Sequence, residues 1–226
     1  MFRNSRRLVL QYYNGDKKSM NSGNVVSYNE EIYRLVEEGW RVLDVGCGTG
    51  HLGERLKADK HCFVIGVEID KDKANQAREK IDGVINSDIE LICVDLKRYG
   101  SFDAIIFADS LEHLRYPAAS LQRLSNYLNS NGYFLISLPN IANWMIRLNL
   151  LLGKFDYQDS GILDKTHLHF FTVSSAKKFV QESGFEILYV GSYNRVMKKL
   201  GCMWKGLFAH QLIVKAQKSS QMRIES

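Results

Sequence analysis

A glycine-rich segment, residues 44–50 with the sequence Asp-Val-Gly-Cys-Gly-Thr-Gly, is the part of the chain whose residue types most directly indicate ligand chemistry. The apolar run 40–45 leads into it, and Leu52 and Leu56 follow at helical spacing, which places the glycines in a strand-to-helix loop. Glycines in such a loop let a ligand approach the backbone and the amides that begin the helix. Several cofactors use this pattern, so the loop alone does not select one.

Asp44 and His51 narrow the choice of cofactor. His51 stands where the dinucleotide-binding fingerprint has its third glycine, so the match to a nucleotide-dependent oxidoreductase fails at that position. A carboxylate at Asp44, beside the loop, would repel a pyrophosphate and attract a cation. S-adenosylmethionine is a cationic ligand of this kind, because it carries an ammonium and a sulfonium group and no phosphate. The loop and Asp44 therefore favour a cationic ligand such as S-adenosylmethionine over a dinucleotide.

Further acidic residues follow the next two predicted strands. Glu68 ends the second strand, where its carboxylate can accept hydrogen bonds from both ribose hydroxyls, whereas Asp70 precedes a charged helix and is better explained as its N-cap. For the adenine we choose Asp88 with the backbone amide of Ile89; Asp95 is the alternative, but it leaves a short connection to the next strand. The predicted cofactor-binding residues are Asp44, Gly46, Cys47, Gly48, Thr49, Gly50, Glu68, Ile69, Asp88, Ile89 and Asp109.

Two histidines are the candidates for acid–base chemistry. Ligands of open α/β sheets lie across the carboxyl ends of the strands, so an acceptor should face residues 109–117, after the fourth strand. His113 belongs to that loop, and histidine titrates near neutral pH, which makes it the first candidate for removing a proton. His167 is the second. We predict both as catalytic residues.

The same region allows a different interpretation, a metal site. Glu112, His113 and His167 could bind a divalent ion, with Asp109 or His169 completing the set. Clustered polar residues in a loop more often form a hydrogen-bonded rim, and Glu112 can pair with Arg115. We therefore predict that no metal is bound.

Alternating apolar runs and amphipathic segments predict the elements that must position these residues. Predicted strands cover 40–45, 62–67, 83–87, 102–108 and 132–138, and predicted helices cover 27–38, 51–60, 71–80 and 117–128. This alternation is typical of an α/β fold with a parallel sheet. A helix over 174–183 and strands over 185–190 and 210–216 follow. The last two strands have no long helix between them, so the final strand is expected to run antiparallel.

Taken together, these segments resemble class I S-adenosylmethionine-dependent methyltransferases. The resemblance rests on Val42-Leu-Asp-Val-Gly-Cys-Gly-Thr-Gly50, Glu68, Ser87-Asp-Ile-Glu90 and Phe102-Asp-Ala-Ile-Ile-Phe-Ala-Asp109. Downstream, Leu111-Glu-His-Leu114, Ser137-Leu-Pro-Asn140, Gly161-Ile-Leu-Asp-Lys-Thr-His167 and Phe170-Phe-Thr172 resemble a bacterial subgroup. That subgroup is similar to methionine-biosynthesis W-like and quinone-biosynthesis methyltransferases, including those of polysaccharide and glycolipid clusters.

The resemblance implies a Rossmann-like α/β fold, a seven-stranded sheet in the order 3-2-1-4-5-7-6 with strand 7 antiparallel, flanked by helices. We expect one domain over 1–226. Its parts are an N-terminal arm and helix (1–39), a cofactor-binding half (40–138), an acceptor-side insertion or lid (139–173), a C-terminal helix and strands (174–216) and a tail (217–226). The expected reaction is methyl transfer to a small-molecule, quinone-like or glycan- or lipid-linked acceptor, at oxygen. A non-catalytic S-adenosylmethionine-binding partner protein is the alternative.

The charge distribution bears on the partners. The chain has 226 residues and a net charge of +5, but residues 1–20 carry +4 and residues 195–226 carry +6, which leaves −5 for residues 21–194. An acidic central body argues against a nucleic-acid substrate. The N-terminus has no signal-peptide pattern, no apolar run is long enough to span a membrane, and the four cysteines form no C-x-x-C pair, so we expect a cytoplasmic protein.

Residues 141–152 form a strongly apolar segment that contains Trp144 and Leu150 to Leu152. The simpler interpretation is a core element or a contact between two copies of the chain. The functional alternative is a lid over an apolar acceptor, which could also touch a membrane surface together with Trp204 and Phe208.

Overall fold

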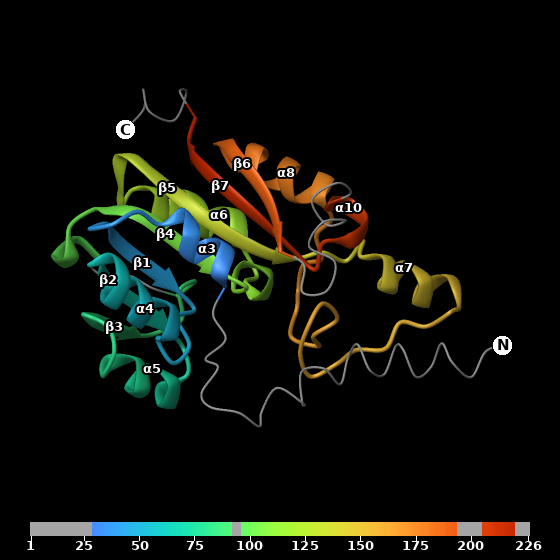
Figure 1. The fold of residues 1–226 in the computed structure, drawn as a ribbon, viewed down its shortest axis with the longest axis horizontal. Helices are drawn as coiled ribbons and strands as arrows, with labels where there is room; N and C mark the ends of the chain where they lie inside the picture. The colour runs from blue at the N-terminus through green and yellow to red at the C-terminus, as the bar shows by residue number, and fades with distance from the viewer. Residues whose placement is uncertain (1–28, 92–95, 194–204, 220–226) are drawn as a thin grey trace.

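A computed structural model describes residues 29–91, 96–193 and 205–219, which form a seven-stranded sheet flanked by helices (Figure 1). The strands are β1 Arg41–Val45, β2 Phe63–Glu68, β3 Gly83–Asn86, β4 Phe102–Ala108, β5 Leu128–Pro139, β6 Phe185–Tyr193 and β7 Gln211–Lys218. The helices are α3 Glu30–Leu35, α4 His51–Lys60, α5 Lys71–Arg78, α6 Pro117–Ser125, α7 Trp144–Leu151, α8 Val173–Glu182 and α10 Lys205–Phe208. Two single 3₁₀ turns are η1 Leu96–Tyr99 and η2 Leu111–His113.

The strand order is β3-β2-β1-β4-β5-β7-β6, as predicted. The first five strands are parallel, and Asp44 of β1 pairs in register with Gly66 of β2 and Ile106 of β4. β7 runs antiparallel to both β5 and β6, which confirms the prediction for the last strand. Because the parallel strands all end at one edge of the sheet, the loops after β1, β2 and β4 gather there.

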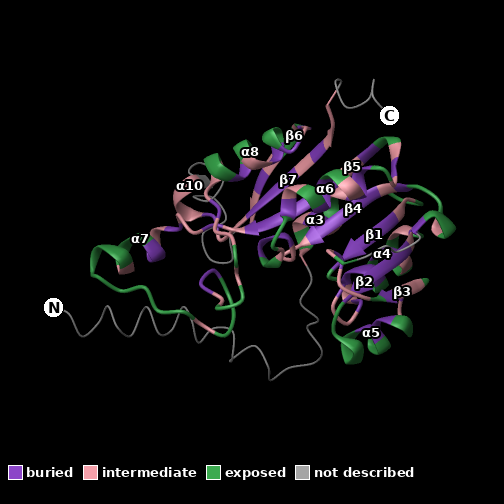
Figure 2. Cartoon of the chain, turned by 180° about the vertical axis from the view of Figure 1, so that it is seen from behind, coloured by how far each residue is buried: buried purple, intermediate pink, exposed green. Residues whose placement is uncertain are grey.

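The sheet has a separate apolar cluster on each face, because successive residues of a strand point to opposite sides. In β1, Leu43 belongs to one cluster and Val42 to the other. Side chains from α6 and α8 pack in the first cluster, and side chains from α3, α4 and α5 pack in the second. Buried segments accordingly follow the strands in Figure 2. This rigid sheet holds the loops at its edge.

Helices α6 and α3 both end before the residues predicted from the sequence. Helix α6 ends at Ser125 rather than at Leu128, because Leu128 already pairs with Phe102 as the first residue of β5. Helix α3 is shorter than the predicted 27–38: it ends at Leu35, and Val36 is extended, with φ −80° and ψ 135°. In both cases an apolar residue at helical spacing packs in the core without being helical.

Helix α7 extends from the main body, as both views show (Figures 1 and 2). Its first turn packs inward through the buried Met145 and Ile146, the latter in a small cluster with Ile162 and Leu163. Its last turn is open, and Leu151 is 83% exposed. The simpler prediction of a core element therefore holds for the first turn only. Over the described residues, the structure contains no helix with the length and apolar character needed to cross a membrane.

Candidate active site

The glycine loop after β1 takes its shape from backbone hydrogen bonds and left-handed glycines. The amides of Gly46 and Cys47 donate to the carbonyl of Val67, at 2.8 and 3.1 Å, which fixes the loop against the end of β2. Gly48 has φ +55°, and a Cβ built on it meets no atom within 4 Å. The space that a side chain at Gly48 would occupy is therefore open. Such space is what a close approach of a ligand to this backbone requires, and the approach itself stays a prediction.

Glu68 binds the backbone of two loops at once. One carboxylate oxygen accepts a hydrogen bond from the amide of Gly48 at 2.8 Å, and the other accepts one from the amide of Asp70 at 2.9 Å. Asp70 is the N-cap of α5, where its side chain accepts from the amides of Asp72 and Lys73, so that prediction is confirmed. Each oxygen of Glu68 retains a lone pair for a further donor.

Asp44, at the end of β1, is a buried carboxylate with an unmet hydrogen-bonding need. It is 2% exposed, and its Oδ1 has no hydrogen-bond partner among the described residues. Burial, together with the nearby charge of Glu68, raises the pKa of Asp44 from 3.8 to about 7. A buried carboxylate is stabilised by a cationic partner. The environment of Asp44 thus fits the positively charged cofactor that the sequence predicts.

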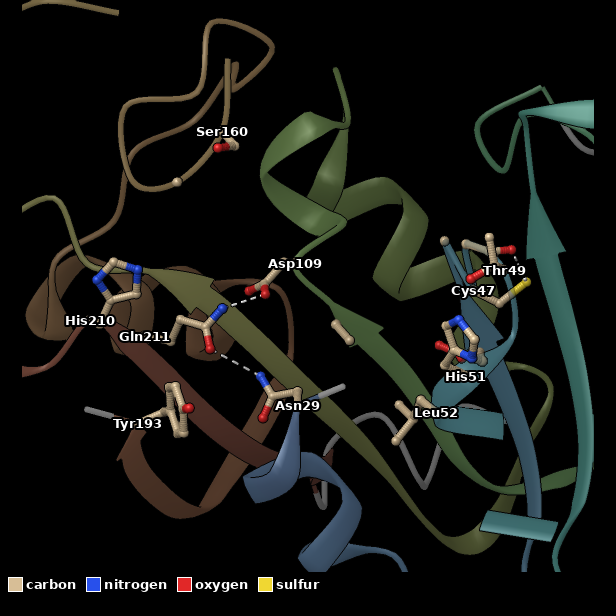
Figure 3. A pocket seen from close by; sticks show the side chains of 15 residues that line it. Asn29, Cys47, Thr49, His51, Leu52, Asp109, Ser160, Tyr193, His210 and Gln211 are labelled. Carbon is tan, nitrogen blue, oxygen red and sulfur yellow. Dashed lines mark hydrogen bonds between the residues drawn. The ribbon is translucent and has the colours of Figure 1, made fainter. Parts of the chain in front are cut away.

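A cavity of about 660 Å³ lies at the edge of the sheet where the parallel strands end (Figure 3). It extends from the glycine loop to the end of β6 and the start of β7. Six of the predicted cofactor residues line it, namely Asp44, Gly46, Cys47, Gly48, Thr49 and Asp109. Gly50, Glu68, Ile69, Asp88 and Ile89 do not. Of these, Gly50 is the N-cap of α4, and a Cβ there would lie 3.0 Å from Ala77.

The predicted adenine and ribose contacts at the ends of β2 and β3 are not part of this cavity. Asp88 accepts a hydrogen bond from the amide of Glu90 at 2.8 Å, Ile89 is buried, and Ile69 is exposed. The cofactor roles of these residues therefore stay predictions. The alternative Asp95 lies outside the described residues, as does Trp204.

Asp109 occupies the opposite wall of the cavity from the glycine loop (Figure 3). It has φ +53°, and its carboxylate accepts hydrogen bonds from the hydroxyl of Ser137, at 2.6 Å, and from the side-chain amide of Gln211. Burial raises the pKa of Asp109, and the two hydrogen bonds oppose that rise. Asn29 extends the chain of contacts by donating to Gln211 at 3.2 Å.

Several cavity residues were not predicted from the sequence. Asn29, Tyr193, His210 and Gln211 come from the start of α3, the end of β6 and the start of β7, and residues 160–161 come from the loop between α7 and α8. Except for Gly161, which begins the Gly161–His167 segment of the family resemblance, none belongs to a motif found in the sequence. Only the position of Asn29 could have been predicted, because asparagine is a favourable N-cap and its side chain accepts a hydrogen bond from the amide of Ile32. Tyr193, His210 and Gln211 reach the cavity because β7 lies between β5 and β6.

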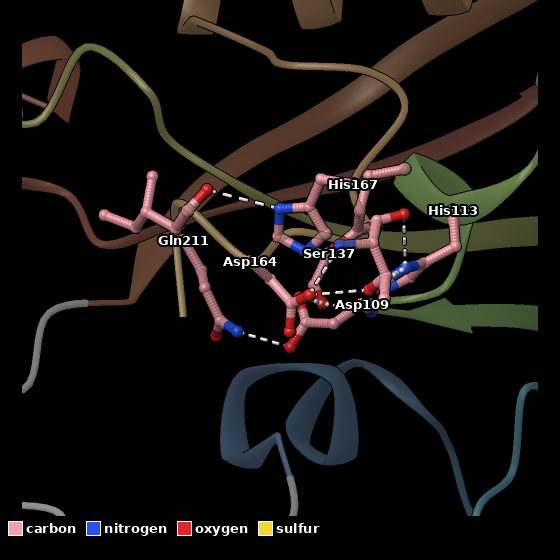
Figure 4. A network of polar contacts seen from close by, with 9 residues as sticks. Asp109, His113, Ser137, Asp164, His167 and Gln211 are labelled. Carbon is pink, nitrogen blue, oxygen red and sulfur yellow. Dashed lines mark hydrogen bonds and ion pairs between the residues drawn. The ribbon is translucent and has the colours of Figure 1, made fainter. Parts of the chain in front are cut away.

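The two predicted catalytic histidines are brought together beside Asp109 (Figure 4). The rings of His113 and His167 meet edge to face with centroids 4.8 Å apart, although 54 residues separate them in sequence. Nε2 of His167 lies 3.7 Å from Oε1 of Glu112. Ligand atoms of all three side chains lie within 4.8 Å of one another. We refer to Glu112, His113 and His167 as the two-histidine cluster.

Glu112 is the most deeply buried member of the two-histidine cluster. Its side chain is 0% exposed, and neither carboxylate oxygen has a hydrogen-bond partner within the described part of the chain. Burial, followed by the charge of Asp109, raises the pKa of Glu112 well above its usual value. The expected pairing with Arg115 is wrong, because η2 points Glu112 into the protein while Arg115 is exposed.

The loop between α7 and α8 orients both imidazoles. Nδ1 of His167 donates to the carbonyl of Ile162 at 3.2 Å, which leaves Nε2 facing Glu112. Nδ1 of His113 lies 3.1 Å from the hydroxyl of Thr166, which in turn donates to Asp164 at 2.6 Å. Burial, and then proximity to His113, lowers the pKa of His167. His169, the other possible ligand, lies outside the cluster, and its Nε2 is buried without a partner among the described residues.

Comparison with known proteins identifies related sequences. The sequence model of a family described as a methyltransferase domain matches residues 10–190. An uncharacterized protein of Methanocaldococcus jannaschii is 27% identical over 197 residues, which cover 79% of this chain and 74% of that protein. A ubiquinone biosynthesis O-methyltransferase of Neisseria meningitidis is 31% identical over 45% of each chain. A tRNA1(Val) (adenine(37)-N6)-methyltransferase of Bacteroides fragilis is 33% identical over 48% of this chain and 56% of that protein. This chain thus spans only about half the length of the latter two.

Solved structures share the fold. An S-adenosylmethionine-dependent methyltransferase of Mesorhizobium loti has a TM-score of 0.61 at 18% identity, with 84% of this chain and 96% of that chain covered. A chain in the complex of the Haloferax volcanii Trm112 methyltransferase activator with a methyltransferase has a TM-score of 0.59 at 14% identity, with 84% and 87% covered. At such identities the likeness concerns the arrangement of strands and helices.

Proposed function

This chain belongs to the methyltransferase domain family, and from that premise we propose that it transfers a methyl group from S-adenosylmethionine to an oxygen atom of a small-molecule, quinone-like or sugar- or lipid-linked acceptor. S-adenosylmethionine is the cofactor, and when bound it supplies a methyl group already activated on a sulfonium. The protein's own residues then have three tasks, which are to hold the cofactor, to align the acceptor and to take up its proton.

The observation that carries the proposal is the environment of Asp44. Its buried Oδ1 has no hydrogen-bond partner in the described part of the chain. Asp44 also lines the cavity, as does Gly48. We propose that Asp44 pairs with the positive charge of the cofactor, that the backbone at Gly48 approaches it closely, and that Glu68 fixes the loop while accepting from the ribose. Asp88 and Ile89 are proposed to hold the adenine.

The acceptor side is proposed to lie between Asp109 and the two-histidine cluster. Asp109 lines the cavity and interacts electrostatically with His113. His113 and His167 are proposed to act on the acceptor hydroxyl, with one imidazole nitrogen accepting its proton as the oxygen attacks the methyl group in line. The O-methyltransferase among the relatives supports oxygen as the attacking atom.

Other assignments of the acceptor are less well supported. The tRNA-modifying relative suggests a nucleic acid as the acceptor. The net charge of −5 over residues 21–194 opposes this assignment, because it would repel a phosphate backbone. A non-catalytic S-adenosylmethionine-binding partner would need the glycine loop and Asp44 but no pair of imidazoles next to Asp109. The exposed end of α7 supports the further proposal that an apolar acceptor, or the membrane surface that carries it, is contacted there.

The test is methylation of a lysate with isotope-labelled S-adenosylmethionine, followed by separation into lipid, small-molecule, protein and nucleic-acid fractions. We expect label in the lipid or small-molecule fraction with the wild-type protein and none with Asp44→Asn. Label in the nucleic-acid fraction would contradict the proposed acceptor class. Cofactor binding with no labelled fraction would favour the non-catalytic alternative.

A further inference from the structure

The buried carboxylate of Glu112 lies beside two imidazoles without a hydrogen bond to either. We propose that Glu112, His113 and His167 form a binding site for a divalent transition-metal ion. The site would link the loop of residues 153–172 to the turn η2 that follows β4. It lies in the proposed acceptor region, but the proposal of the site itself rests on the geometry of these three side chains.

The first step of the argument is the unpartnered carboxylate. Both oxygens of Glu112 are buried and lack a hydrogen-bond partner in the described part of the chain. Native proteins rarely leave such groups unsatisfied, and an isolated buried carboxylate is expensive. The closest cationic or donor group among the ion pairs of Glu112 is Nε2 of His167, and its distance of 3.7 Å exceeds a hydrogen bond. A bound cation would satisfy the carboxylate.

The spacing of the three side chains is the second step. Two ligands bound tetrahedrally at about 2.0–2.1 Å from zinc lie roughly 3.4 Å from each other. The separation between Glu112 and His167 is 3.7 Å, and all three ligand atoms lie within 4.8 Å of one another. Small side-chain rotations would therefore complete the coordination. Asp109 is not a member of this cluster, and its two oxygens already accept hydrogen bonds from Ser137 and Gln211.

The hydrogen bonds behind the imidazoles are the third step. A metal-ligating histidine usually donates its other ring N–H to a carbonyl or carboxylate, which fixes its orientation. Nδ1 of His167 donates to the carbonyl of Ile162, and Nδ1 of His113 contacts Thr166, whose hydroxyl donates to Asp164. Both rings are thus held in the manner expected of ligands.

The donor set indicates which ions would bind. Two imidazole nitrogens and one carboxylate suit Zn²⁺, Mn²⁺ or Fe²⁺, whereas Mg²⁺ and Ca²⁺ prefer oxygen ligands. Three protein ligands leave a coordination position for a water or an acceptor oxygen. In the metal-bound state His113 and His167 would act as ligands, and the ion would lower the pKa of a coordinated acceptor hydroxyl in place of the free imidazole base proposed above.

A metal ion at this site would also hold the loop between α7 and α8 against turn η2. The amides of Leu168 and His169 already donate to the carbonyl of Glu112, at 2.9 and 3.2 Å. An ion held by both His113 and His167 would add a second link at the same place. Lys154 and Lys165 are exposed within this loop, so tryptic cleavage after them reports on how firmly the loop is held.

The test measures binding of Zn²⁺ to metal-free wild-type protein by calorimetry and compares it with Glu112→Gln, His113→Ala and His167→Ala. We expect one Zn²⁺ per chain, an affinity at least about tenfold lower in each variant, and Mg²⁺ binding that is much weaker. Zn²⁺ should also slow tryptic cleavage of the wild-type loop but not of Glu112→Gln. His61→Ala removes an exposed histidine outside the site and is the matched control.

Binding of S-adenosylmethionine to the same variants shows whether each is folded, and it separates failure of this proposal from failure of the proposed function. X-ray absorption of the Zn²⁺-loaded wild type should show two imidazoles and no sulfur, a measurement that needs no variant. The proposal is overturned if Zn²⁺ does not bind the wild type, if it binds through cysteine, or if it binds the three variants as tightly as His61→Ala.

Discussion

The carboxylate of Glu68 accepts a hydrogen bond from the backbone amide of Gly48 at 2.8 Å, so the acid that ends β2 fixes the glycine loop that follows β1. Its other oxygen accepts from Asp70, and the carboxylate also adds to the rise in the pKa of Asp44. One residue therefore sets both the shape of the cofactor loop and the electrostatics of the carboxylate at its start.

Glu68→Gln should weaken cofactor binding. The glutamine keeps the shape of the side chain, but one of its terminal atoms can no longer accept from a backbone amide. A hydrogen bond to a charged group contributes about 1.5–3 kcal/mol, so calorimetry should show S-adenosylmethionine bound roughly 10- to 100-fold more weakly. Asp70→Asn, which alters only the N-cap of α5, should leave the affinity unchanged. Equal affinities for Glu68→Gln and wild type would contradict the role given to Glu68.

Cofactor affinity should depend on pH through Asp44. With a pKa of about 7 in the protein without cofactor, Asp44 is largely neutral at pH 6 and ionised at pH 8. The attraction for a cationic ligand is thus lost as the pH falls through 7. The dissociation constant of the wild type should decrease from pH 6 to pH 8, with proton release on binding near pH 7. In Asp44→Asn the affinity should be low and flat over this range; a parallel pH dependence in the variant would exclude Asp44 as its source.

Ionisation of Asp44 should lower the free energy of unfolding at high pH. Folding raises the pKa of Asp44, so the free energy of unfolding is not reduced by this group below pH 3.8 and falls as the pH rises to about 7. The shift corresponds to a cost on the order of 4 kcal/mol when Asp44 is ionised. Urea denaturation of the protein without cofactor should therefore find Asp44→Asn more stable than wild type at pH 8, and by less at pH 5. A destabilised variant at pH 8 would show that Asp44 has a stabilising partner.

Gly48→Ala should lose cofactor affinity while keeping the fold. A Cβ at Gly48 meets no protein atom within 4 Å, so the structural cost is the left-handed backbone alone, about 1–2 kcal/mol. The new methyl group occupies space next to the cavity, and the larger Gly48→Val should abolish binding. Gly39 is a matched control, because it also has a positive φ and open space around a Cβ but does not line the cavity. Gly39→Ala should lower the free energy of unfolding to a similar extent and leave cofactor affinity intact.

His113→Ala and His167→Ala should lower methyl transfer without lowering cofactor affinity. Loss of a positioned acid–base group typically reduces turnover by about 10²–10⁴-fold. The measurement is single-turnover transfer at saturating cofactor, with His61→Ala as the control for loss of a histidine. Unchanged turnover in both variants would remove the histidines from the acceptor side.

The sequence was sufficient to predict the sheet and part of the cavity lining. Strand-to-helix periodicity predicted the strands, the resemblance implied their order, and the spacing around Asp44 and Gly48 predicted the glycine loop that lines the cavity. The sequence also offered His113 and His167 as catalytic candidates, and only the structure places their rings together. Local periodicity could not separate Leu128 from α6, because a core-facing leucine suits a helix end and a strand start equally.

The rest of the site depends on long-range packing. Asn29 and Gln211 meet at the cavity, although 182 residues separate them, because β7 inserts between β5 and β6 and α3 packs against the same sheet. The burial of Glu112 could not be predicted from the sequence either, since a glutamate in a polar loop with Arg115 nearby suggests a surface ion pair. Turn η2 reverses that expectation by directing Glu112 inward.

The most direct test of the central claim uses purified protein and the lysate fraction that accepts label. Production of S-adenosylhomocysteine, the demethylated cofactor, is measured by mass spectrometry together with the mass of the product. The account predicts that each S-adenosylhomocysteine formed is matched by one acceptor molecule heavier by one methyl group, with wild type but not with Asp44→Asn. S-adenosylmethionine that binds but is never converted, with any acceptor fraction, would contradict it.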